Sequence, residues 1–77
     1  MADITLFGET RCHKTRFYQA ALDERGLDYE LAEVDKDAEA ARRLTELAGS
    51  ADKFPTFQFR GRKLRNPLLP DLVNELA

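Results

Sequence analysis

The sequence contains little of what marks several classes of protein. Its 77 residues include one cysteine, one histidine and no tryptophan. A single cysteine excludes an internal disulfide framework. One cysteine and one histidine also cannot supply the four ligands of a structural zinc site, so no metal centre is expected.

Long apolar stretches and an excess of basic charge are also absent. No apolar run approaches the ~18–20 residues that span a bilayer, and the net charge is -2 with a pI of about 5.3. Nucleic-acid-binding domains are usually basic, so we expect neither a nucleic-acid partner nor a membrane. The first four residues have no basic segment leading into an apolar one, so no signal peptide is predicted and a reducing cytoplasm is the expected location.

The pattern of apolar residues predicts seven elements in the order β-α-β-α-β-β-α, within one domain of residues 1–77. An apolar, β-branched run predicts a strand at 4–7, and partial alternation predicts another at 29–34. Alternating aromatic and polar residues predict a third strand that begins near Pro55. The third strand forms a hairpin with a short strand at 63–64, through a turn at residues 60–62. We expect a four-stranded mixed sheet with helices on its faces and a monomeric protein.

Three helices are expected between and after these strands. The first runs from residue 12 to a C-cap at Gly26, with an apolar face made of Phe17, Ala20, Ala21 and Leu22. The second is capped by Asp35 or Asp37 and ends at Gly49 and Ser50. The last covers 71–76, with Pro70 in its first turn.

The single cysteine, Cys12, lies where the first helix is expected to begin. Arg11, His13, Lys14 and Arg16 surround it within four residues. Nearby positive charge lowers the pKa of a thiol, and the thiolate is the nucleophilic form. We therefore predict a reactive Cys12 that is tuned by these side chains. The alternatives are an unreactive free cysteine and an exposed His13 without a chemical role.

In element order and length, the whole chain resembles the glutaredoxin-like branch of the thioredoxin superfamily. Cys12 follows the first strand, and Phe54-Pro55-Thr56 opens the third strand, where that family has its cis-proline. The resemblance implies a thioredoxin-like fold, a cis peptide bond before Pro55 and a nucleophilic cysteine at a helix N-terminus. The family's second active-site cysteine corresponds to Thr15, so residues 12–15 look like a monothiol C-x-x-T variant whose Thr15 hydroxyl hydrogen-bonds the sulfur.

The same resemblance implies glutathione as a possible cofactor, with further contacts to disulfide-bearing proteins. Arg42 is near a family position that binds a glutathione carboxylate, and Arg11 and Lys53 add positive charge. Phe54 and Pro55 are expected to offer their backbone to the bound thiol or peptide, and the Phe54 ring a recognition surface.

Two features depart from the family pattern. Glu9 stands where glutaredoxins often carry a lysine, and Arg65 and Asn66 stand near the family's paired glycines.

The resulting hypothesis is a monothiol thiol–disulfide oxidoreductase that acts on glutathione mixed disulfides or protein disulfides through Cys12, regenerated by glutathione or another small thiol. Three alternatives stay open. One is a redox-inactive module that binds a protein partner. Another is an iron–sulfur cluster bridged between two chains by Cys12 and glutathione. The third is an oxyanion reductase, because Cys12 and Arg16 have the C-x-x-x-R spacing of the arsenate-reductase-like branch.

Overall fold

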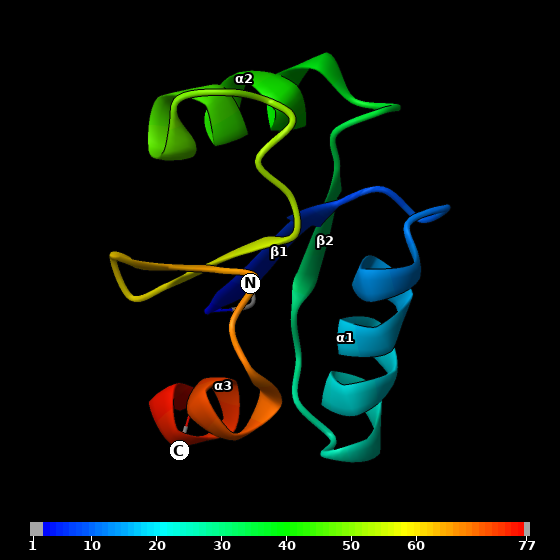
Figure 1. Ribbon diagram of the computed structural model, residues 1–77, viewed down its shortest axis with the longest axis vertical. Helices are drawn as coiled ribbons and strands as arrows, with labels where there is room; N and C mark the ends of the chain where they lie inside the picture. Colours follow the sequence, from blue (N-terminus) through cyan, green and yellow to red (C-terminus); the bar gives the residue numbers. More distant parts are fainter. Residues whose placement is uncertain (1–2, 77) are drawn as a thin grey trace.

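The computed structural model describes residues 3–76, and the predicted domain range of 1–77 extends beyond them at both ends, where Met1, Ala2 and Ala77 lie outside the described residues. The elements follow the predicted order (Figure 1). The strands are β1 (Ile4–Gly8), β2 (Glu30–Glu33), β3 (Thr56–Phe59) and β4 (Arg62–Arg65), and the helices are α1 (His13–Glu24), α2 (Ala38–Ala48) and α3 (Leu69–Leu76). No helix in the described part of the chain is long and apolar enough to cross a membrane.

The four strands form one mixed sheet in the order β2-β1-β3-β4. β1 pairs in parallel with β2, and β3 pairs antiparallel with both β1 and β4. Arg60 and Gly61 connect β3 to β4 with φ of 49° and 79°. Two successive positive φ values are typical of the two-residue turns that match the twist of a hairpin.

Helices cover both faces of the sheet, because successive side chains of a strand point to opposite sides. On one face, Ile4 and Leu6 of β1 pack with buried residues of α1 and α3, among them Tyr18 and Leu72. On the other face, Phe7 packs against the α2 side chains, which include the fully buried Leu44. Figure 1 shows α2 on its own side of the sheet, with α1 and α3 together on the other.

The predicted apolar face of α1 is wrong in part. Phe17 is 52% exposed and Ala20 is also exposed. The buried residues of the helix are Thr15, Tyr18, Ala21 and Leu22. The physical reason lies at the helix start, where Thr15 packs directly on Gly8 of β1 and so fixes the rotation of the helix.

Most helix ends lie where the sequence predicts them. Asp37, rather than Asp35, caps α2, because its carboxylate accepts a hydrogen bond from the Glu39 amide at 3.0 Å. Gly26 and Gly49 follow α1 and α2 with φ of 66° and 94°, the left-handed conformation that favours glycine. The last helix begins two residues earlier than predicted, at Leu69, and includes Pro70 in its first turn.

Candidate active site

Three connecting segments meet at one edge of the sheet and form the candidate site. Phe7 near the end of β1 pairs with Thr56 at the start of β3, which brings the loop after β1 beside the segment that precedes β3. The chain leaving β4 joins them, since the Asn66 amide donates to the Pro55 carbonyl at 2.9 Å. This arrangement brings the predicted site residues 11–16 and 53–55 to the same edge.

Cys12 is the N-cap residue of α1, with an extended backbone (φ -78°, ψ 126°). Its amide donates to the Glu9 carbonyl at 2.9 Å, and its carbonyl accepts from the Arg16 amide at 3.2 Å. The side chain is partly exposed and makes no capping hydrogen bond, and the first turn of the helix has no acidic residue. The first amides of a helix have no partner within the helix, so here they are available to the sulfur.

The pKa of Cys12 is lower than that of an ordinary cysteine, as predicted, and the causes of the lowering are the helix start and Thr15, which the family resemblance implied, rather than the flanking charges. Partial burial is the largest single influence and raises the pKa. The Thr15 amide, the Thr15 hydroxyl and the Lys14 amide together outweigh it, because each stabilises the thiolate, while the Glu9 carboxylate acts in the opposite direction. The principal causes therefore include no neighbouring cation.

The four basic side chains that flank Cys12 are exposed. The Arg11 Nε atom pairs with Glu9 Oε1 at 2.9 Å. His13, Lys14 and Arg16 are exposed on the first turn of α1. The helix start itself, with its free amides and dipole, is what favours the thiolate.

Thr15, which the resemblance aligns with the family's second cysteine, is completely buried. Its hydroxyl makes no hydrogen bond of good geometry, yet it lowers the Cys12 pKa. A thiolate is a much stronger hydrogen-bond acceptor than a thiol, so the hydroxyl contributes when Cys12 is ionised. The Thr15 and Lys14 amides stabilise the same thiolate. A Cβ atom added to Gly8 would lie 2.4 Å from Thr15 Oγ1, so glycine is required there to make room for the threonine.

The peptide bond between Phe54 and Pro55 is cis, as predicted, and Pro55 is buried. The Phe54 ring is half-buried and packs against the Phe7 cluster on the α2 side of the sheet. The expectation of an exposed Phe54 recognition ring is therefore wrong, because the ring completes the apolar core there. Lys53 is exposed on the same segment.

Arg42, predicted to bind a carboxylate of glutathione, lies on α2 and already pairs with two carboxylates of its own helix. Its guanidinium forms ion pairs with Glu39 and with Glu46, one turn away on either side. These contacts hold the pKa of Arg42 above its ordinary value. A glutathione carboxylate would have to displace them.

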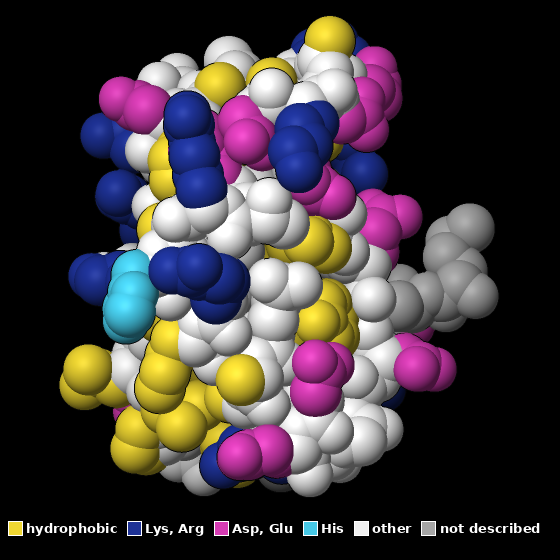
Figure 2. Space-filling view, turned by 90° about the vertical axis from the view of Figure 1, so that its right-hand side faces the viewer, with side chains coloured by type: hydrophobic (Ala, Val, Ile, Leu, Met, Phe, Trp, Pro, Cys, Tyr) yellow, Lys and Arg dark blue, Asp and Glu magenta, His cyan; other side chains and the backbone are white. Residues whose placement is uncertain are grey.

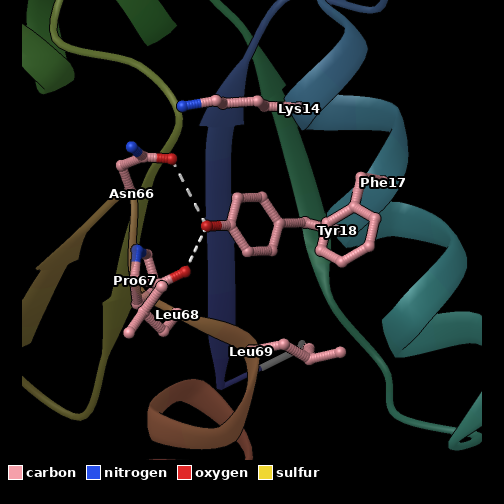
Figure 3. A pocket seen from close by; sticks show the side chains of 7 residues that line it. All are labelled: Lys14, Phe17, Tyr18, Asn66, Pro67, Leu68 and Leu69. Atoms are coloured by element: carbon pink, nitrogen blue, oxygen red, sulfur yellow. Dashed lines mark hydrogen bonds between the residues drawn. The ribbon is translucent and has the colours of Figure 1, made fainter.

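An apolar groove beside the site is a feature that the sequence analysis does not predict. The groove lies between α1 and the β4–α3 connection, has a volume of about 300 Å³, and is lined by Lys14, Phe17, Tyr18, Asn66, Pro67, Leu68 and Leu69 (Figure 3). The sequence pattern places Phe17 on the apolar face of the first helix. The signal for a groove is the Pro67-Leu68-Leu69 run, because Leu69 packs against the core and the adjacent Leu68 is exposed.

Comparison with known proteins settles the family. The glutaredoxin family model matches residues 4–63 of the chain. The chain belongs to the glutaredoxin family. Members of this family are thiol–disulfide oxidoreductases or resemble them, and a chain with one cysteine fits the monothiol type. No curated protein sequence matches significantly.

Solved glutaredoxin structures share this fold at low sequence identity. A glutaredoxin from Archaeoglobus fulgidus is 18% identical with a TM-score of 0.83, and the match covers 100% of this chain and 88% of that one. The thioredoxin-like protein BC3987, solved as a mutant, is 25% identical with a TM-score of 0.87 and coverage of 99% and 96%. A buckwheat glutaredoxin–glutathione complex is 18% identical with a TM-score of 0.66 and coverage of 82% and 59%. These likenesses establish the thioredoxin-like fold.

Proposed function

We propose that this glutaredoxin-family protein is a monothiol thiol–disulfide oxidoreductase. The Cys12 thiolate attacks one sulfur of a mixed disulfide, which breaks the old S–S bond and forms a new one to Cys12. The other sulfur leaves with the electron pair and takes a proton from water. An external thiolate then attacks the Cys12 disulfide, releases the Cys12 thiolate and carries away the transferred group. Neither step requires a second cysteine in the chain.

The observation that carries this proposal is the position of Cys12 at the start of α1. The amides of Lys14 and Thr15 stabilise its thiolate and lower its pKa. A lower pKa increases the thiolate fraction near neutral pH. Thr15 at the position of a resolving cysteine leaves the external thiol as the route of regeneration.

Glutathione or another small thiol is the proposed external thiol, with disulfide-bearing proteins as substrates and the cytoplasm as the location. Lys53 offers a free ammonium group beside Pro55 for a carboxylate, since it has no ion pair within residues 3–76. Glu9 opposes an anionic thiol near Cys12, because its carboxylate already raises the Cys12 pKa. We therefore expect glutathione to bind weakly and to act mainly as the regenerating thiol.

A coupled assay tests the proposal. The substrate is a glutathionylated peptide. Glutathione attacks the resulting Cys12–glutathione disulfide and forms glutathione disulfide, which glutathione reductase reduces with NADPH, so NADPH consumption reports turnover. We expect turnover with the natural chain and none with Cys12→Ser. A rate equal to that of Cys12→Ser would contradict the proposal.

A further inference from the structure

The groove between α1 and the β4–α3 connection brings together the two large apolar side chains that are most exposed among the described residues. Phe17 is 52% exposed and Leu68 is 73% exposed, and both line the groove. Its volume of about 300 Å³ is at the lower limit of pockets that hold small molecules. That volume suits one or two side chains of a partner.

The Tyr18 hydroxyl, the polar end of an aromatic side chain in the groove, is hydrogen-bonded. The Tyr18 hydroxyl donates to the Pro67 carbonyl and lies 3.4 Å from Asn66 Oδ1 (Figure 3). The Tyr18 ring is held edge-on against Phe57, with ring centroids 5.0 Å apart. An occupant of the groove therefore meets mainly apolar surface.

One charged group of the groove has no counterpart in the described part of the chain. Lys14 lines the groove and makes no ion pair within residues 3–76, and no acidic side chain lines the groove. Figure 2 shows hydrophobic side chains gathered below the only histidine, with Lys and Arg side chains above them. This charge distribution favours an occupant that combines an apolar side chain with a carboxylate.

The groove is connected to the reactive sulfur through Lys14, two residues after Cys12. The Lys14 amide stabilises the Cys12 thiolate, while the Lys14 side chain lines the groove. Phe17 follows Cys12 by five residues, which is about 7.5 Å along a helix axis and about 140° around it, so their Cα atoms are about 9 Å apart. An extended peptide advances about 3.3 Å per residue. A side chain that reaches Phe17 would thus stand about two to three residues from the cysteine that reacts at Cys12.

We propose that this groove binds a segment of a disulfide-bearing polypeptide substrate. It takes an aromatic or aliphatic side chain about two to three residues from the substrate cysteine, and Lys14 pairs with a carboxylate next to that side chain. The inference rests on the proposed function and adds to it the side chains that a preferred polypeptide substrate carries beside its disulfide. Glutathione has no apolar side chain, so it leaves Phe17 and Leu68 uncovered.

Short peptides with an activated disulfide test this preference. Each carries one cysteine joined to 2-thiopyridine. Phenylalanine stands about two or about three residues from the cysteine in either chain direction, with aspartate next to it on the side of the cysteine. The Cys12 thiolate attacks the peptide sulfur and expels pyridine-2-thione with the electron pair. Absorbance then gives the rate, and the intact mass confirms the Cys12–peptide disulfide. The controls replace phenylalanine by glycine or aspartate by asparagine, and the 2-pyridyl disulfide of glutathione reports general reactivity.

We expect the phenylalanine peptide to react at least about tenfold faster than its glycine counterpart at one spacing in one of the two directions. Phe17→Ser and Leu68→Ser should reduce that ratio toward one, and Lys14→Gln should remove the preference for aspartate over asparagine. Lys63→Gln, which neutralises a lysine on β4 away from the groove, should keep both preferences. Because each ratio is internal to one variant, a change in overall reactivity does not affect it.

The possible results distinguish failure of the groove proposal from failure of the proposed function. Equal rates for the phenylalanine and glycine peptides at both spacings in both directions would overturn the groove proposal, as would an unchanged ratio in Leu68→Ser. In both of those cases the proposed function stands if every disulfide reacts faster with Cys12 than with a free cysteine peptide. If none does, both proposals fail.

Discussion

The starts of α1 and α2 have the same local architecture and opposite uses. Each helix begins after an N-cap residue with an extended backbone, Cys12 in one and Asp37 in the other. The Asp37 carboxylate accepts a hydrogen bond from the Glu39 amide, and Glu39 adds an acidic group to the first turn. Cys12 forms no such bond, and α1 has no acidic residue in its first turn.

The difference explains how one chain combines a stable fold with a reactive group. At α2, a carboxylate satisfies the free amides and the helix gains stability. At α1, the same kind of amides lowers the pKa of a thiol instead. The α1 start is left without the cap that would stabilise it most, and its free amides are available for chemistry.

The largest expected effect comes from giving α1 the cap that α2 has. Cys12→Asp should abolish disulfide exchange, because the nucleophile is gone. It should also unfold with a free energy about 1 kcal/mol higher than that of Cys12→Ala, which cannot cap. Chemical denaturation of both variants measures the difference. A Cys12→Asp variant no more stable than Cys12→Ala would mean that the α1 amides are not free.

Gly8→Ala tests the packing that holds α1 in place. The new Cβ would lie 2.4 Å from Thr15 Oγ1 in a fully packed region, so we expect a loss of about 1–3 kcal/mol in the free energy of unfolding. The double variant Gly8→Ala/Thr15→Ala removes the closest clashing atoms. It should be more stable than the sum of the two single changes predicts, and additive effects would argue against this contact.

Asp37→Ala removes the cap of α2 alone. We expect a loss of about 1 kcal/mol in the free energy of unfolding, with no change in the pH dependence of Cys12 alkylation. Asp35→Ala is the matched control, since Asp35 is an exposed aspartate just before the same helix that does not cap it. Equal losses in the two variants would show that general charge, rather than the cap, is responsible.

The smallest stability effect is expected at Thr15. Its buried hydroxyl has no partner, so Thr15→Val should leave the fold as stable or slightly more stable. The same change removes a group that lowers the Cys12 pKa, so the midpoint of pH-dependent alkylation should move upward. In the natural chain that midpoint should lie below the ordinary value of about 8.5. An unchanged midpoint in Thr15→Val would assign the whole effect to the amides.

The sign of the pH effect on stability follows from the lowered pKa of Cys12. The folded state binds the Cys12 proton less tightly than the unfolded chain does, so the thiolate stabilises the fold above the unfolded pKa. That stabilisation is lost as the pH falls through the folded pKa.

The order of elements and the place of Cys12 follow from local signals. The signals for the strand that ends at Gly8 and for the caps at Asp37 and Gly49 each lie within a few residues of the feature they predict. The sequence alone therefore reveals these features. The rotation of α1 is different, because two adjacent aromatic residues, Phe17 and Tyr18, compete for the core. Tyr18 is buried with its hydroxyl bonded to Pro67, 49 residues away, and no local pattern contains that contact.

The causes of the Cys12 pKa shift were predicted in part. The family resemblance implied the helix start and Thr15, which contribute, whereas the flanking charges, which the residues alone suggested, are not among the main causes. Cations are visible in the letters of the chain, whereas the direction of a backbone amide depends on how the helix starts. The ion pairs of Arg42 were not part of the sequence-based prediction. Helical spacing allows Glu39 and Glu46 to pair with Arg42, and the structure shows that both do so.

The hydrogen bond from Tyr18 to Pro67 has a consequence for the kinetics of recognition. It ties α1 to the β4–α3 connection, so both walls of the groove are fixed before any partner arrives. A partner then loses only its own conformational entropy on binding, since the protein has little left to order. Affinity differences among partners should therefore appear mainly in how long each stays bound.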